Sequence, residues 1–239
     1  MLYSPPKKIQ MQPSLAKWRI ESELSVLVFV ELKNTYAKYP IQQGEAEPVV
    51  FDHFTQLLKK AKALNIITID LNQDNITDGM MCLGEYLSQG RQLMIAGEMS
   101  ASFRQVIQHM ASVSTNICLI DDALIFDHAE QHIQCIDNFS AMGLHHVNTQ
   151  TLLRLWSLSA PTEYILSAQG ILLAVAEQLN IEALEIDPSI PLRQYGLDSV
   201  AMVSLVGLWR ANGANIRYED FMGGLTLAQL LKLLLNHAG

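Results

Sequence analysis

The chain has 239 residues, 49% of them hydrophobic and 17% charged, and a formal net charge of −8. This composition supplies a core for one large domain or two small ones and excludes global disorder. The net negative charge argues against a nucleic-acid partner. The longest apolar run, 26–30, is too short for a membrane span. Three cysteines without metal-ligand spacing, and no apolar N-terminal signal, favour a cytoplasmic protein with reduced thiols.

Residues 1–24 are proline-containing and read as an N-terminal arm. Short apolar runs then alternate with helical patterns through residues 25–157, which is typical of βαβ units and a parallel sheet covered on both faces. The expected strands are 25–31, 65–71, 91–97, 116–122 and 144–147, and the expected helices are 49–64, 79–88, 101–112, 128–142 and 149–157. We therefore predict an α/β, Rossmann-like three-layer domain.

A second, helical region follows a short linker at residues 158–162, which contains a proline and small side chains. Residues 163–239 show apolar residues at helical spacing, separated by one long loop at 180–198. The expected elements are a helix at 163–179, a helix at 199–211, a short segment at 218–222 and a final helix at 226–236. This pattern predicts a small all-α domain.

The stretch Tyr195-Gly196-Leu197-Asp198-Ser199 stands directly before the apolar helix 199–211. Asp198 is a suitable N-cap for that helix. Ser199 then lies at the positive end of the helix dipole, near N–H groups without intrahelical partners, which suits a phosphate. No basic residue lies close enough in sequence to activate the serine as a nucleophile. An ordinary capped helix would carry the same dipeptide, so the motif depends on its context.

The order helix, long loop, Gly-Leu-Asp-Ser helix, short helix, helix resembles a thiolation (carrier protein) domain. The run Tyr195 to Val200, with Trp209-Arg210 downstream, is most similar to the aryl carrier subgroup of siderophore synthesis. The resemblance covers 161–239 and implies a four-helix carrier fold. It also implies that phosphopantetheine is esterified to Ser199, beside Asp198, and holds an aryl acid as a thioester.

The resemblance further implies a sequence of partners. A phosphopantetheinyl transferase would attach the arm, an aryl-acid adenylating ligase would load it with 2,3-dihydroxybenzoate or salicylate, and a condensation or cyclisation domain of a nonribosomal peptide synthetase would receive the aryl group. Four apolar or aromatic residues are candidates for partner contact, namely Val200, Val203, Tyr218 and Met222. The resemblance implies that Val203, Tyr218 and Met222 dock the downstream condensation or cyclisation domain. The alternative is that these residues belong to the core.

The α/β region, followed by an aryl carrier, resembles the bifunctional isochorismatase–aryl carrier proteins of siderophore synthesis. Glu31 stands where that family has its catalytic aspartate, and 92–97 is similar to the strand before its active-site turn. The segment 118–124 and the following helix match the family's later elements in order. The resemblance implies an isochorismatase-like fold for residues 25–157.

Three departures lead us to expect no independent catalysis by this region. Glu31 is one methylene longer than the family's aspartate, no Lys or Arg occurs between Asp70 and Gly90, and Phe103-Arg104 would fill the substrate pocket. We therefore expect a non-catalytic scaffold, either for partners or for self-association as a homo-oligomer. The alternatives are a true bifunctional enzyme that hydrolyses isochorismate with Glu31, and a region that binds a metabolite and regulates loading.

Other polar clusters favour structural interpretations. His128 and His132 lie at i, i+4, but a solvated helix face is expected because no third metal ligand can be placed. His145-His146 is expected to be a polar strand edge. Asp121-Asp122 stands at the C-terminus of an expected strand, so it is either a solvated strand end, a helix cap or a remnant ligand site.

Overall fold

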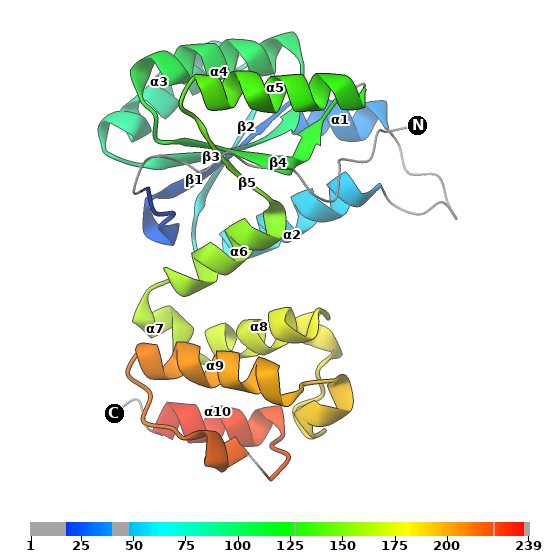
Figure 1. The fold of residues 1–239 in the computed structure, drawn as a ribbon, viewed down its shortest axis with the longest axis vertical. Coiled ribbons are helices and arrows are strands. Elements are labelled where there is room, and N and C mark those ends of the chain that lie inside the picture. The colour runs from blue at the N-terminus through cyan, green and yellow to red at the C-terminus, as the bar shows by residue number, and fades with distance from the viewer. Residues whose placement is uncertain (1–17, 40–47, 127, 222, 237–239) are drawn as a thin grey trace. The chain divides into compact units, whose positions relative to one another are not determined.

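The computed structural model describes residues 18–39, 48–126, 128–221 and 223–236. The chain divides into two units, Met1–Ser159 and Ala160–Gly239 (Figure 1). The first contains a sheet with helices on both faces, and the second is helical. This confirms the predicted α/β fold followed by an all-α domain.

The sheet of the first unit has five parallel strands in the order β2-β1-β3-β4-β5. They are β1 (Ser25–Val30), β2 (Ile67–Leu71), β3 (Gln92–Glu98), β4 (Ile117–Ile125) and β5 (His145–Val147). Every residue of β1 is buried, which explains its unbroken apolar run. The chain order reverses between β1 and β3, so the carboxyl ends of these two strands form the switch point of the sheet.

Helices cover both faces of this sheet (Figure 1). One face packs against α2 (Val49–Ala63) and α6 (Thr149–Leu158), and its core contains Phe51, Phe54 and Trp156. The other face packs against α3 (Ile76–Ser88), α4 (Ala101–Val113) and α5 (Ala129–Ala141), around Phe103 and Met110.

Two features of the first unit differ from the sequence-based expectation. A short helix, α1 (Leu32–Lys38), follows β1 directly and was not predicted. Residues 18–24, assigned to the arm, pack on the sheet: they include the 3-10 helix η1 (Ser22–Leu24), and Trp18 stacks on His145 at 4.0 Å between ring centroids. The rest of the arm, 1–17, lies outside the described residues.

Strand β4 extends three residues beyond the predicted end at residue 122. Its pairing with β3 shifts register, because Ile95 pairs with Leu119 whereas Gly97 pairs with Leu124. The β4 residues between these two pairs form an irregularity in the strand, and they include Asp121 and Asp122. Two adjacent aspartates concealed the continuation of the strand, since aspartate is normally depleted from strands.

The second unit contains α7 (Thr162–Ile165), α8 (Ala168–Leu179), α9 (Ser199–Ala211) and α10 (Leu227–Asn236). Three 3-10 helices connect them: η2 (Ala183–Glu185), η3 (Leu192–Tyr195) and η4 (Tyr218–Phe221). The single helix predicted at 163–179 is wrong, because the chain breaks at residues 166–167. Ser167 begins a new helix there, with its Oγ accepting the N–H of Gly170 at 3.0 Å.

Within the described parts of the chain, no helix has the length and apolar character needed to cross a membrane.

Candidate functional site

Ser199 is exposed and is the first residue of α9. Gly196, with φ 97°, ends η3 in the left-handed region, where glycine is favoured. Leu197 is buried and anchors the turn, and Asp198 Oδ1 then accepts the N–H of Ala201 at 2.7 Å. The predicted cap and the predicted start of the helix are both present.

The loop before α9 is held by backbone hydrogen bonds to the segment around the start of α10. Leu192 N–H donates to the Leu225 carbonyl, and Ala228 N–H donates to the Pro188 carbonyl, both at 3.0 Å. Pro191 also bridges Thr226. The turn that presents Ser199 is therefore fixed by contacts far apart in sequence.

A small hollow of about 20 Å³ lies beside Ser199, with Arg193, Asp198 and Tyr218 among its lining residues. This volume is about that of one water molecule, so a phosphate on Ser199 would stay at the surface. Arg193 lines the same hollow as Ser199 and brings a positive charge to it. Sequence reasoning missed it because it lies on the preceding η3, six positions earlier in the chain.

The structure places three of the four predicted docking residues. Val200 and Val203 are 73% and 57% exposed on α9, whereas Met202, Leu205 and Val206 of the same helix are buried. Tyr218 is half-buried on η4 and lines the hollow beside Ser199. Met222 lies outside the described residues. Val200 and Val203 are therefore not core residues.

Glu31 follows β1 at the switch point and is only 5% exposed. It has a left-handed conformation, φ 64°, which is unusual for a residue other than glycine. Its Oε2 accepts a hydrogen bond from Asn34, whereas Oε1 is buried and has no hydrogen-bond partner. Strain and an unsatisfied buried oxygen often occur together at functional sites.

Glu98, at the end of β3, lies close to Glu31. Thr35 Oγ1 is within hydrogen-bond distance of both the Glu31 carbonyl (2.7 Å) and Glu98 Oε2 (3.3 Å), and Glu98 forms an ion pair with Lys38 of α1. The ion pair raises the pKa of Lys38 well above its usual range. A lysine therefore does lie at the carboxyl ends of these strands. It comes from α1, whereas the segment between Asp70 and Gly90 contains no Lys or Arg.

The expectation that Phe103 and Arg104 fill a substrate pocket is wrong. Phe103 is fully buried in the core between the sheet and α3, α4 and α5, and Arg104 is exposed on α4. Helical periodicity explains the difference, since neighbouring positions on a helix point in different directions.

The expected solvated face at His128 and His132 is wrong for His132, which is fully buried and stacks on Phe126 at 4.3 Å between ring centroids. Burial disfavours its charged form and lowers its pKa to about 4. His128 is exposed. No cluster of three or more His, Cys, Asp or Glu side chains suited to a metal ion occurs among the described residues.

His146, predicted as part of a polar edge, is instead largely buried, and its Nδ1 lies 2.8 Å from Asp121 Oδ1. Burial raises the pKa of Asp121, and His146 partly opposes this shift. Strand β5 is indeed the edge of the sheet, and its His145 is half-buried and stacks on Trp18.

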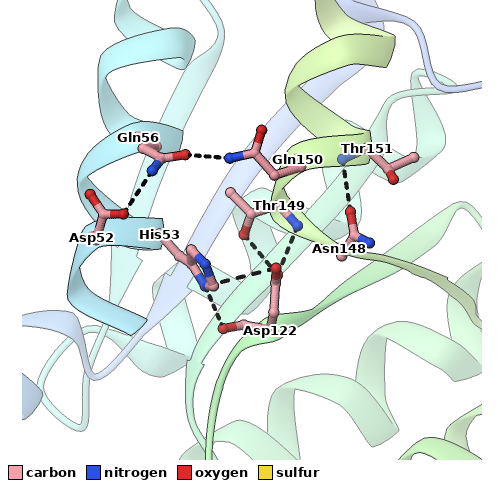
Figure 2. Close-up of polar contacts among 8 residues, drawn as sticks. All are labelled: Asp52, His53, Gln56, Asp122, Asn148, Thr149, Gln150 and Thr151. Carbon is pink, nitrogen blue, oxygen red and sulfur yellow. Dashed lines mark hydrogen bonds and ion pairs between the residues drawn. The ribbon is translucent and has the colours of Figure 1, made fainter. Parts of the chain in front are cut away.

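Asp122 joins two helices to the sheet (Figure 2). Its Oδ1 accepts the N–H and the hydroxyl of Thr149 in α6, at 2.7 and 2.8 Å, and its carbonyl accepts from His53 Nδ1 of α2 at 2.8 Å. A further bond joins Gln150 to Gln56 across the same two helices. Asp122 therefore binds the first residue of α6, whose N-cap is Asn148, and is not a solvated strand end.

Comparison with known proteins finds a family match within the second unit. Residues 169–234 match the model of the family "Phosphopantetheine attachment site". The chain is also similar to phenyloxazoline synthase MbtB of Mycobacterium sp. (strain MCS), at 38% identity over 69 residues. This match covers 29% of the chain and 6% of that relative.

The matched segment includes the exposed serine of α9, its aspartate cap and the hollow lined by Arg193. An accessible hydroxyl, a helix N-terminus and a guanidinium fit a phosphodiester well. Residues 169–234 form a phosphopantetheine attachment domain, which carries this group covalently.

Proposed function

We propose that the chain is an aryl carrier protein of nonribosomal peptide siderophore synthesis, with phosphopantetheine attached to Ser199. The observation that carries the proposal is that Ser199 is exposed at the capped start of α9, inside the segment that matches the phosphopantetheine family. When bound, the arm supplies a thiol that holds an aryl acid, 2,3-dihydroxybenzoate or salicylate, as a thioester.

The residues around Ser199 have separate roles in this proposal. Asp198 fixes the first turn of α9, so that the hydroxyl stays accessible and the N–H groups of the turn face the phosphodiester. Arg193 compensates the charge of the phosphate. The hollow is too small to enclose the arm, so the arm can move between partner enzymes.

The partners follow from this sequence of steps. A phosphopantetheinyl transferase attaches the arm, an aryl-acid adenylating ligase loads it, and a downstream condensation or cyclisation domain receives the aryl group. Val203 on α9, with Tyr218 and Met222, is proposed to contact the downstream condensation or cyclisation domain, and Val200 is a further exposed candidate for partner contact. Exposed apolar side chains next to the attachment point suit a modest, transient interface. We place this activity in the cytoplasm.

We propose that the α/β unit is an isochorismatase-like scaffold without catalysis of its own, which serves partners or self-association. Protonation of a vinyl ether needs a proton donor held against the substrate and a cation to balance its carboxylates. Lys38 already forms an ion pair with Glu98, and two further carboxylates, Glu31 and Asp70, lie near each other at the same end of the sheet. An excess of carboxylates suits a dianionic substrate poorly.

The alternative is a bifunctional enzyme that also hydrolyses isochorismate. The buried Glu31 at the switch point, with one unsatisfied oxygen, favours it. Incubation with isochorismate and detection of pyruvate with lactate dehydrogenase distinguishes the two. We expect no release above the uncatalysed rate. Turnover that disappears in Glu31→Gln would establish the bifunctional enzyme.

The carrier function is tested by intact-protein mass spectrometry. The protein is incubated with coenzyme A and a phosphopantetheinyl transferase, and then with ATP, an aryl-acid adenylating ligase and each candidate acid. We expect two successive mass increments, for the arm and for one of the two aryl groups. A protein that gains the arm but accepts neither acid would contradict the aryl assignment.

A further inference from the structure

Leu184, in the 3-10 helix η2, is 99% exposed, more than Val200 or Val203 on α9. A single exposed apolar side chain is common and has no meaning by itself. The way in which the chain holds this leucine is what distinguishes it.

The turn that carries Leu184 is stabilised by a reciprocal capping box. Glu185 Oε2 accepts the N–H of Glu182 at 3.2 Å, and the Glu182 side chain accepts the N–H of Glu185. Ile186, the next residue, is buried and anchors the turn to the domain. Leu184 is thus presented on an ordered turn, so less conformational entropy is lost when a partner binds it.

The same turn is linked to the attachment site. The N–H of Asp187 donates to the phenolic oxygen of Tyr195 at 2.8 Å, and Tyr195 ends the η3 helix that leads into Gly196 and Asp198. Leu184 and Ser199 therefore belong to one hydrogen-bonded loop. A protein seated on Leu184 is held at a defined position relative to the arm.

The surroundings of Leu184 are acidic. Glu182 and Glu185 flank it and are exposed, and the whole chain carries a net charge of −8. A second copy of this chain would bring like charges together, which disfavours self-association through this turn. Charge complementarity instead favours a partner with lysine or arginine around an apolar socket.

We propose that Leu184 inserts into an apolar socket, rimmed by Lys or Arg, on the enzyme that acylates the thiol of the phosphopantetheine arm. This inference rests on the proposed carrier function. The phosphopantetheinyl transferase has to contact the start of α9, because it acts on the Ser199 hydroxyl. An enzyme that acts on the far end of the arm can dock on a different turn.

The test uses the full-length protein carrying phosphopantetheine, with an aryl-acid adenylating ligase, ATP and the accepted aryl acid. Aryl loading is measured as a function of carrier concentration for wild type, Leu184→Ala and Leu235→Ala. Leu235 is a matched control, since it is a 44% exposed leucine of the same unit. We expect Leu184→Ala to lower kcat/KM about tenfold through KM, as for a central interface residue, and Leu235→Ala to stay within about twofold.

The acidic rim is tested with the double variant Glu182→Gln/Glu185→Gln. Glutamine retains an acceptor oxygen for the capping box, so the turn is kept while two charges are removed. At low ionic strength KM should rise several-fold, and the difference from wild type should shrink at high salt because screening weakens the attraction. A salt response identical to that of wild type would overturn the basic rim.

Two outcomes overturn the proposal as a whole. One is a Leu184→Ala protein that is acylated at the wild-type rate, which leaves the carrier function intact. The other is an equal loss in the transferase step, which would mean that Leu184 serves the attachment enzyme or the fold. A wild-type protein that accepts no phosphopantetheine would refute the carrier function itself, and is detected before any variant is compared.

Discussion

Asp198 accepts the backbone N–H of Ala201 at 2.7 Å, three residues into α9, and so fixes the turn on which Ser199 is exposed. The first helical hydrogen bond, from Met202 N–H to the Asp198 carbonyl, follows at 3.0 Å. One aspartate therefore both begins the helix and orients the N–H groups beside the serine.

Removal of this cap should destabilise the second unit. Asp198→Ala is expected to lower its free energy of unfolding by about 1 kcal/mol, since it removes an N-cap side chain. Asp198→Asn is the control, because asparagine caps equally well. Thermal unfolding followed by circular dichroism measures both. Equal stabilities for the Ala and Asn variants would show that the cap contributes nothing.

The close approach of β1 and β3 should be intolerant of any side chain at Gly97. Gly97 has φ 130°, and a Cβ there would lie 2.2 Å from the Val30 carbonyl oxygen. Gly97→Ala should therefore destabilise the first unit by more than about 3 kcal/mol or prevent folding.

Gly84 is the matched control for Gly97. It lies within α3, and a Cβ there meets nothing within 4 Å. Gly84→Ala should stabilise the protein by about 1 kcal/mol, because alanine is the better helix former. Urea unfolding compares the two variants, and a tolerated Gly97→Ala would contradict the observed strand packing.

Buried His132 should make stability depend on pH. Its pKa is lowered to about 4 in the folded protein, whereas an unfolded histidine titrates near 6.5. The unfolded state therefore takes up a proton first as the pH falls. The contribution of neutral His132 to stability is fully present above pH 6.5 and is lost as the pH falls towards 4. The pKa difference between the folded and unfolded states corresponds to about 3 kcal/mol.

Other groups titrate over the same range, so the comparison is between variants. Urea unfolding between pH 7 and pH 4.5 is expected to show a shallower decline for His132→Gln than for wild type, whatever the stability of the variant at pH 7. His109→Gln, at an exposed histidine of α4, should keep the wild-type slope. Parallel slopes for all three proteins would show that His132 is not buried in its neutral form.

A charge at Val203 should affect partners and not the fold. Val203 is more than half exposed on α9, so Val203→Glu is expected to change stability by less than about 0.5 kcal/mol. Attachment of the arm and aryl loading should proceed normally, whereas transfer to the condensation or cyclisation domain should slow. If loading and transfer fell equally, Val203 would not be specific to the downstream partner.

The sequence predicted the carrier region closely because its signals are local. The cap at Asp198, the helix that runs to Ala211 and the short helix at Tyr218 each depend on residues within a few positions. The break at Ser167 was missed because apolar spacing continues across it, and a serine cap is weaker evidence than a run of apolar residues.

The α/β unit shows what local patterns leave undetermined. The parallel strands were predicted from their apolar runs, but the contacts of Glu98 with Thr35 and Lys38 join residues about sixty positions apart. His132 and His146 looked polar in sequence, yet both are buried by packing that periodicity alone does not specify. Long-range contacts of this kind appear only when the chain is folded.

The most direct test of the account is the intact mass of wild type and Ser199→Ala after incubation with coenzyme A and a phosphopantetheinyl transferase. We expect wild type to gain one phosphopantetheine, with the modified peptide containing Ser199, and Ser199→Ala to gain none. Since Ser199 is exposed, the variant should fold normally, as circular dichroism can verify. A modified Ser199→Ala protein would contradict the assignment of Ser199 as the attachment site.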